Sequence, residues 1–198
     1  MTAASTPKGE RRRQALVVAA AELLVESGLD AIRHRAVAER AGLPLASTTY
    51  YFDSLDELTA AAVEFAGRQE LAEGRERLAQ LSAGPHGVDE VVELVLDLLL
   101  GHRSRHGGPE SVLLRYERLV GSPRRPYLAP LMREMGDELN ALLAEIFDRC
   151  GMPVDGERLF EIVALVDGAV VNALIGSDPD PRAVARRLLR SRLRGCAE

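Results

Sequence analysis

The sequence predicts an all-α fold with a small N-terminal head of three helices and a larger C-terminal helical body. Hydrophobic residues make up 46% of the 198 residues, yet only 4% are aromatic and none is Trp, so Leu, Val and Ala must build the core. Such a composition favours helices over sheets. Apolar residues also recur at three- and four-residue spacing, and no alternating run of β-branched residues is long enough for a strand.

The first helix is expected over about residues 10–27, after an N-terminal arm. Its apolar stripe has helical spacing, and Gly28 suits a C-cap. Arg11, Arg12 and Arg13 fall in the first predicted turn, where cations oppose the helix dipole. Two interpretations stay open for these arginines: contact with nucleic-acid phosphates, or a solvated cluster.

A short helix, a break and a second short helix are expected over residues 33–52. Gly42 can adopt the positive φ that ends a helix, and Pro44 suits the first turn of the next. The second helix is crowded with uncharged side chains that end in hydroxyls, unlike a buried helix or an ordinary solvated one. Such a surface can hydrogen-bond to phosphates and press methyls and rings against base edges. The pattern is typical of a helix-turn-helix motif that binds DNA.

The N-terminal part resembles the DNA-binding domain of the TetR/AcrR family of transcriptional repressors. Where the family commonly has a cation, this chain has Leu45 and Leu55. It also has Arg33 in place of a usual Thr and Thr49 in place of a usual Tyr. The residues that carry the resemblance are Ala19 to Leu24, Gly28, Val37, Ala38, Ala41, Gly42, Ser47, Phe52 and Asp56 to Leu58.

The resemblance implies two domains. These are a TetR-type helix-turn-helix DNA-binding domain over residues 10–70, with its motif at 33–52, and a regulatory, ligand-binding and dimerisation domain over residues 71–198. It implies a cytoplasmic homodimer that represses transcription until a small-molecule effector releases it from a near-palindromic operator in double-stranded DNA. Base contacts are expected from Leu45, Thr48 and Tyr50. Contacts with phosphates or groove edges are expected from Arg11, Arg12, Arg13, Arg33, His34, Arg35, Ser47, Thr49 and Tyr51.

The charge distribution agrees with a protein that touches DNA at one end. The net charge is −5, yet residues 1–54 hold seven Lys or Arg side chains against six Asp or Glu. The head is therefore mildly cationic and the remainder acidic, which is informative where the net charge is not.

The rest of the chain reads as helices separated by Gly- and Pro-rich loops. Ser54 to Glu57 form a capping box at the start of a long helix, which is expected to break or kink near Gly67 or Gly74. In the family this helix connects the head to the body. The helices are expected at residues 55–81, 88–101, 109–120, 127–150, 156–175 and 182–194.

The helix at 156–175 is apolar on nearly every side, so it should be buried on more than one face. One face would pack in the monomer and the other on a second subunit. The last helix carries many arginines, interpreted as a solvated face or as a second nucleic-acid patch. The dimer interface is expected to include Ala164, Gly168, Asn172, Leu188 and Leu189.

Four side chains of the body are candidates for lining an effector pocket, although a role in the core explains them equally well. They are Tyr116, Met132, Met135 and Phe160.

The sequence shows no catalytic constellation, no cofactor motif and no segment long and apolar enough for a membrane span. His102 and His106 have a spacing that metals use, but no Cys or carboxylate accompanies them, so no metal site is expected. Cys150 and Cys196 match no metal or redox spacing. The alternative to a regulator is a helical ligand-binding or adaptor protein without operator binding, and a small all-α enzyme comes third.

Overall fold

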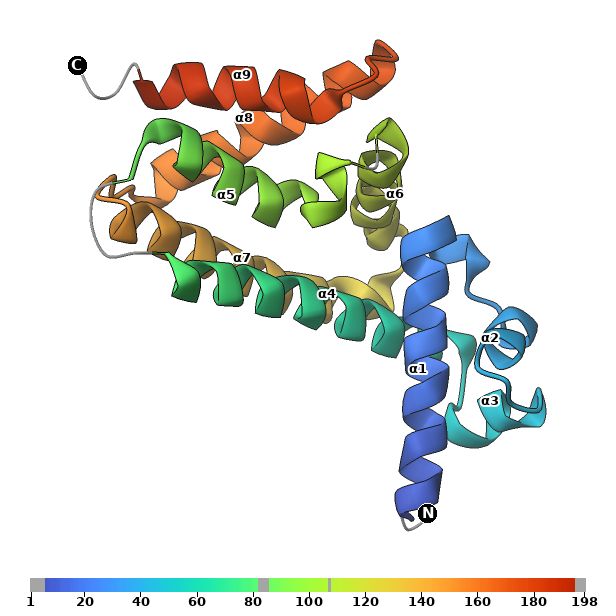
Figure 1. The fold of residues 1–198 in the computed structure, drawn as a ribbon. Coiled ribbons are helices and arrows are strands. Elements are labelled where there is room, and N and C mark those ends of the chain that lie inside the picture. The colour runs from blue at the N-terminus through green and yellow to red at the C-terminus, as the bar shows by residue number, and fades with distance from the viewer. Residues whose placement is uncertain (1–5, 82–85, 107, 195–198) are drawn as a thin grey trace. The chain divides into compact units, whose positions relative to one another are not determined.

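The computed structural model describes residues 6–81, 86–106 and 108–194, and every regular element in these ranges is a helix (Figure 1). The all-α prediction is confirmed. None of the helices in these ranges has the length and apolar character that a membrane crossing requires. The α-helices are α1 (Pro7–Ser27), α2 (His34–Arg40), α3 (Ala46–Tyr51), α4 (Leu55–Gln80), α5 (Val88–Leu100), α6 (Gly108–Gly121), α7 (Ala129–Arg149), α8 (Gly156–Ile175) and α9 (Pro181–Arg194). The short 3-10 helices are η1 (Leu29–Ala31), η2 (His102–Arg105), η3 (Ser122–Arg124) and η4 (Pro126–Leu128).

Two compact units divide the chain, and they differ from two contiguous domains. The head unit contains residues 1–69 and 114–133, and the body unit contains residues 70–113 and 134–198. The segment 114–133 packs with the head because its apolar residues enter the head's core, where Leu128 is fully buried. Helices α4, α6 and α7 therefore each pass from one unit into the other.

Helix α1 begins at Pro7, three residues earlier than the sequence predicted. Thr6 is its N-cap, since the Thr6 Oγ1 accepts a hydrogen bond of 3.1 Å from the backbone N–H of Gly9. The arginines at 11–13 consequently lie beyond the first turn, where the helix dipole no longer opposes them. Gly28 ends α1 with φ of +80°, as expected of a C-cap glycine.

The head unit's core is built from small and aliphatic side chains around α1. Leu16 and Ala20 of α1 are fully buried, as are Val37 of α2 and Leu58 of α4. Phe52, which follows α3, is also buried, as predicted. Ala19, Ala20 and Ala21 of α1 are also buried, so small side chains fill much of this core in place of aromatic rings.

Helix α4 is capped as the sequence predicted but continues without the expected break. The Ser54 Oγ accepts from the backbone N–H of Glu57 at 3.1 Å, and the Glu57 side chain accepts from the backbone N–H of Asp53 at 2.7 Å. Gly74 has a packing role. A methyl group on its Cα would lie 2.7 Å from a methyl of Leu98 and 2.9 Å from one of Leu142. The glycine thus permits close packing of α4 against α5 and α7 within the body unit.

In the body unit, α8 and α9 pack together and α5 packs beside both (Figure 1). Helix α8 has the predicted bounds, and the Asp155 side chain caps it by accepting from the backbone N–H of Arg158 at 2.8 Å. Helix α9 begins at Pro181, one residue before its predicted start, since Pro is favoured in the first turn.

Candidate nucleic-acid interface and ligand pocket

The turn between α2 and α3 has the geometry that its glycine predicts. Gly42 has φ of +64°, and the Leu43 backbone N–H reverses to donate to the Ala38 carbonyl at 2.9 Å. The chain then passes through Pro44 into α3, which is only six residues long. This is the helix-turn-helix arrangement that the sequence predicted.

Helix α3 exposes an uncharged face of rings, methyls and hydroxyls. Tyr50 is 70% exposed and Leu45, just before the helix, is 54% exposed. Thr49 is exposed, whereas Ser47 and Tyr51 are half-buried. The Tyr50 and Tyr51 rings meet edge to face, with centroids 4.8 Å apart, so each restricts the other's orientation.

Thr48 corrects one expectation. Its side chain has no exposed area, and its Oγ1 donates to the Leu45 carbonyl at 2.8 Å. A threonine whose hydroxyl is satisfied by its own helix and whose methyl is buried cannot touch a base edge. Thr48 therefore holds the start of α3 against the head instead of contacting DNA.

The predicted contacts before the turn are placed at the start of α2. Arg33 is its N-cap residue and is exposed, with its Nε donating to the Asp30 carbonyl at 3.3 Å. Arg35 is exposed, and His34 is half-buried. Arg40, at the other end of α2, reaches Glu22 and Glu26 of α1 at 3.3 and 2.8 Å, which fixes α2 to α1.

The three arginines of α1 do not share one environment. Arg11 and Arg12 are exposed, while Arg13 is half-buried with its guanidinium carbon 4.8 Å from the centre of the Phe52 ring. That distance is typical of a cation–π contact. Arg13 therefore helps to close the head's core next to α3, and only its neighbours keep the exposure that the phosphate interpretation assumes.

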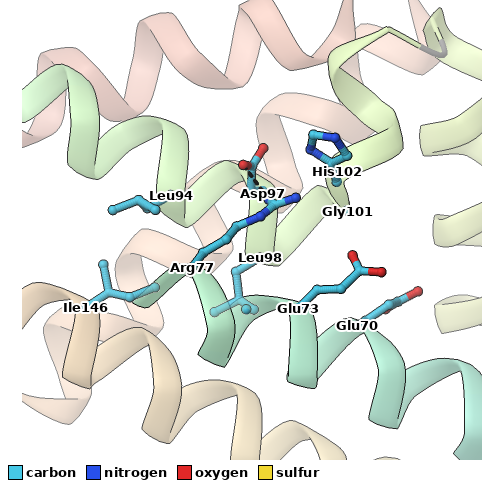
Figure 2. Close-up of a pocket in the computed structure, with 10 residues that line it drawn as sticks. Glu70, Glu73, Arg77, Leu94, Asp97, Leu98, Gly101, His102 and Ile146 are labelled. Atoms are coloured by element: carbon cyan, nitrogen blue, oxygen red, sulfur yellow. Dashed lines mark hydrogen bonds and ion pairs between the residues drawn. The ribbon is translucent and has the colours of Figure 1, made fainter. Parts of the chain in front are cut away.

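A pocket that is partly open to solvent lies in the body unit (Figure 2). Its walls combine apolar side chains with three carboxylates. The lining residues are Glu70, Glu73, Gly74, Arg77, Leu94, Asp97, Leu98, Gly101, His102 and Ile146.

None of the four predicted pocket residues lines this space. Tyr116 and Met132 belong to the head unit, where Tyr116 is buried and Met132 packs on the head's core. Met135 is half-buried on α7. Phe160 is 74% exposed on α8, so it belongs neither to a pocket nor to the core. Periodicity marked these side chains as apolar but could not say which face they would share.

Asp97, in the pocket wall, is a buried carboxylate surrounded by three arginines. Arg77 donates to its Oδ2 at 2.5 Å, and Arg105 binds both oxygens at 2.7 Å. Arg182 donates to Oδ1 at 2.8 Å. Four donors saturate a carboxylate, so Asp97 connects α4, α5, η2 and α9 at a single point.

Arg182 corrects the expectation that the arginines of α9 form one solvated face. Its side chain is 2% exposed, and besides Asp97 it reaches the Ser104 Oγ at 2.7 Å and the Glu93 carboxylate at 2.8 Å. Arg186 also binds Glu93 at 2.5 Å. Burial alone raises the pKa of Glu93, but hydrogen bonds from Arg186 and Arg182 outweigh it, so the pKa lies below its ordinary value.

Sequence reasoning missed this network, although one signal was available. Asp97 is the single charged residue between Leu94 and Leu100, on a helix whose neighbouring residues are apolar. A carboxylate in such a stretch needs a buried cation.

Helices α8 and α9 carry large apolar side chains that are exposed to solvent. Phe160 and Ile175 are 74% and 78% exposed, and Val171 and Leu188 are also exposed. The small-residue track of Ala164, Gly168 and Asn172 lies exposed on α8 too. Leu189, in contrast, is fully buried within the body unit, so it cannot belong to a dimer interface. We call the remaining exposed residues the α8–α9 surface.

Comparison with known proteins supplies a family. Residues 86–195 match the family model of the tetracyclin repressor-like C-terminal domain. None of the curated proteins that were compared with the chain matches it.

Solved structures are similar to nearly the whole chain. The multidrug binding protein EbrR in complex with ethidium is 29% identical to this chain. The match covers 93% of this chain and 98% of the EbrR chain, with a TM-score of 0.66. EbrR in complex with malachite green is 32% identical, with 90% and 95% covered and a TM-score of 0.61. A TetR family member from Streptomyces coelicolor A3, SCO1917, is 30% identical, with 90% and 95% covered and a TM-score of 0.57.

Proposed function

The chain belongs to the TetR family of transcriptional regulators, and on that premise we propose that it is a dimeric repressor that an organic cation releases from a palindromic operator. The observation that carries this proposal is the face of α3. An exposed Tyr50 on a short helix after a tight turn, with an exposed Leu45 just before that helix, suits insertion into the major groove. The exposed Arg33, Arg35, Arg11 and Arg12 would contact phosphates, which position the helix without reading sequence.

Dimerisation is supported by the α8–α9 surface. Large exposed apolar side chains next to small ones suit close approach of a second copy, because Gly168 has no atom within 4 Å where a side chain would begin. The Asn172 amide donates to the Gly168 carbonyl at 2.7 Å, so its polar group is already partly satisfied. A two-fold dimer would place two α3 helices roughly 34–36 Å apart, one turn of DNA. The operator should then be an inverted repeat, bound in the cytoplasm where the chromosome lies.

The class of effector follows from the charge of the pocket. Asp97 is already paired with arginines, but Glu70 and Glu73 add two further carboxylates to the lining, and Leu94 and Ile146 offer apolar surface. Such a site suits a ligand that is both apolar and positively charged. The relative EbrR is a multidrug binding protein seen with ethidium and malachite green, two aromatic cations. Release would require only modest coupling, since about 1–3 kcal/mol changes affinity roughly 5–150-fold.

Fluorescence anisotropy on the DNA upstream of the protein's own gene tests the proposal. We expect saturable binding with two subunits per site, tighter than to scrambled DNA at equal salt. Tyr50→Ala should weaken binding by about 1–3 kcal/mol, as loss of a groove contact does. Val120→Ala is the matched control, because Val120 is also exposed and in the head unit but lies on α6.

Two results would contradict the regulator. One is equal affinity for upstream, scrambled and selected random DNA, which would favour the ligand-binding or adaptor protein. The other is an equal loss in Tyr50→Ala and Val120→Ala, which would move the interface away from α3. Sedimentation of the protein as a monomer at the binding concentrations would contradict the dimer.

A further inference from the structure

Arg77 occupies the pocket from within. Its side chain extends from α4 to Asp97 on α5 (Figure 2), with the Arg77 Nη1 2.5 Å from the Asp97 Oδ2. In this view Leu94 and Ile146 lie on one side of the guanidinium, and Glu70 and Glu73 on the other. The Arg77 side chain thus lies between the apolar residues and the two glutamates, in the space that a ligand contacting both would have to fill.

Arg77 differs from the other two arginines of Asp97 in its position. It is the one Asp97 partner among the pocket-lining residues. Its side chain is 28% exposed, whereas Arg182 is buried and Arg105 is 36% exposed outside the pocket. Without Arg77, Asp97 would still receive two hydrogen bonds from Arg105 and one from Arg182. The carboxylate therefore stays paired when Arg77 leaves, which avoids the high cost of an uncompensated buried charge.

We propose that Arg77 is a built-in counter-ion of the pocket, which an organic cation displaces from Asp97 when it binds. This inference rests on the effector class proposed above and assigns a residue to its regulation. The cation of the ligand replaces the guanidinium beside Asp97, and its apolar rings occupy the space beside Leu94 and Ile146. Since Arg77 lies on α4, its release removes an ion pair that fixes this helix to α5.

Ethidium is the probe for the test, with binding to the full chain measured by titration calorimetry. Arg77→Met keeps the stem of the side chain and removes the competing charge. We expect ethidium to bind it about tenfold more tightly than wild type, because the ligand no longer has to break the ion pair between Arg77 and Asp97 before it can bind. Phenanthrene, an uncharged ring system, should gain much less.

Arg75→Met is the matched control. Arg75 lies on the same helix but pairs with Glu138 at 2.6 Å and does not line the pocket. It should leave the affinity for ethidium unchanged. Glu73→Gln, at an exposed position where folding is not at risk, should weaken ethidium binding severalfold because it removes one of the pocket's carboxylates.

Different failures separate this inference from the proposed function. Ethidium binding that is equal in wild type and Arg77→Met, or weaker in Arg77→Met, would overturn the displacement while leaving a cationic effector in place. Absence of ethidium binding in wild type, Arg77→Met and Glu73→Gln would overturn the cationic effector itself. Operator binding, measured separately by anisotropy, would then still establish the regulator.

Discussion

The head and body units are held together by different chemistry. The head relies on Leu, Val and Ala packed around α1, and its ion pair from Arg40 to Glu22 and Glu26 lies at the surface. The body buries charge, with Asp97 and Arg182 nearly inaccessible to solvent. Buried ion pairs add little net stability over apolar side chains of the same shape, but removal of one partner is costly. We therefore expect most single substitutions in the head to cost a moderate amount of stability, and a few substitutions of buried charges in the body to cost much more.

The largest effect is expected from Asp97→Asn. The change leaves Arg182 buried with one carboxylate fewer, which should cost about 3–5 kcal/mol of the free energy of unfolding. Glu26→Gln is the comparison in the head. It should change stability far less, because Arg40 keeps Glu22 and the pair is exposed.

Urea denaturation can assign this loss to a unit. All four tyrosines of the chain, at 50, 51, 116 and 127, belong to the head unit. Tyrosine fluorescence therefore reports on the head, and far-UV circular dichroism on both units. For Asp97→Asn we expect the dichroism to fall at lower urea than the fluorescence changes. Coincident transitions at the wild-type midpoint would refute the contrast between the units.

A pair of glycine substitutions tests packing inside the body. Gly74→Ala gains helix propensity but forces Leu98 and Leu142 to move. The cost of overpacking, about 1–3 kcal/mol, should exceed the gain in helix propensity, so we expect the variant to be less stable than wild type. Gly136→Ala on α7 meets nothing within 4 Å, so it should raise stability by roughly 0.5–1 kcal/mol. Thermal melts of both variants give the two signs. A stabilised Gly74→Ala would show that α4 is not packed tightly against α5 and α7.

Mild acid should destabilise the body unit more than the head unit, by less than Asp97→Asn does. Hydrogen bonds from Arg186 and Arg182 hold the pKa of Glu93 in the folded protein below its ordinary value of 4.5. A carboxylate with a lowered folded pKa stabilises the fold above the unfolded pKa, and the contribution is lost as pH falls through the folded pKa. Between pH 5 and pH 3, we expect the body to lose stability, and Glu93→Gln to reduce this pH dependence. An unchanged pH profile in Glu93→Gln would exclude Glu93 as the source.

Helix positions were predictable because local rules place them. Gly28 and Gly42 adopt the positive φ that their positions required, and Ser54 caps α4 as its spacing with Glu57 indicated. The exposed face of Tyr50 followed from hydroxyls and rings gathered on one short helix. These signals involve neighbours within a few residues, which a sequence displays directly.

Contacts between distant residues were not predictable in the same way. Arg182 and Asp97 lie 85 residues apart, and α9's other arginines look identical to Arg182 in the sequence. Thr48 was misplaced because a six-residue helix has too few turns for a periodic pattern to identify its buried side. The packing of residues 114–133 with the head unit was not predictable, because helical periodicity says that a helix buries one face but not which neighbour covers it.

The division of the chain into units bears on how this gene can be recombined. Residues 114–133 supply Leu128 to the core of the head, and α4, α6 and α7 continue across the boundary. A head transplanted as residues 1–69 alone would lack Leu128 and leave that core incomplete. A chimera that exchanges operator specificity between relatives should therefore carry two cassettes, 1–69 and 114–133, on one recipient body.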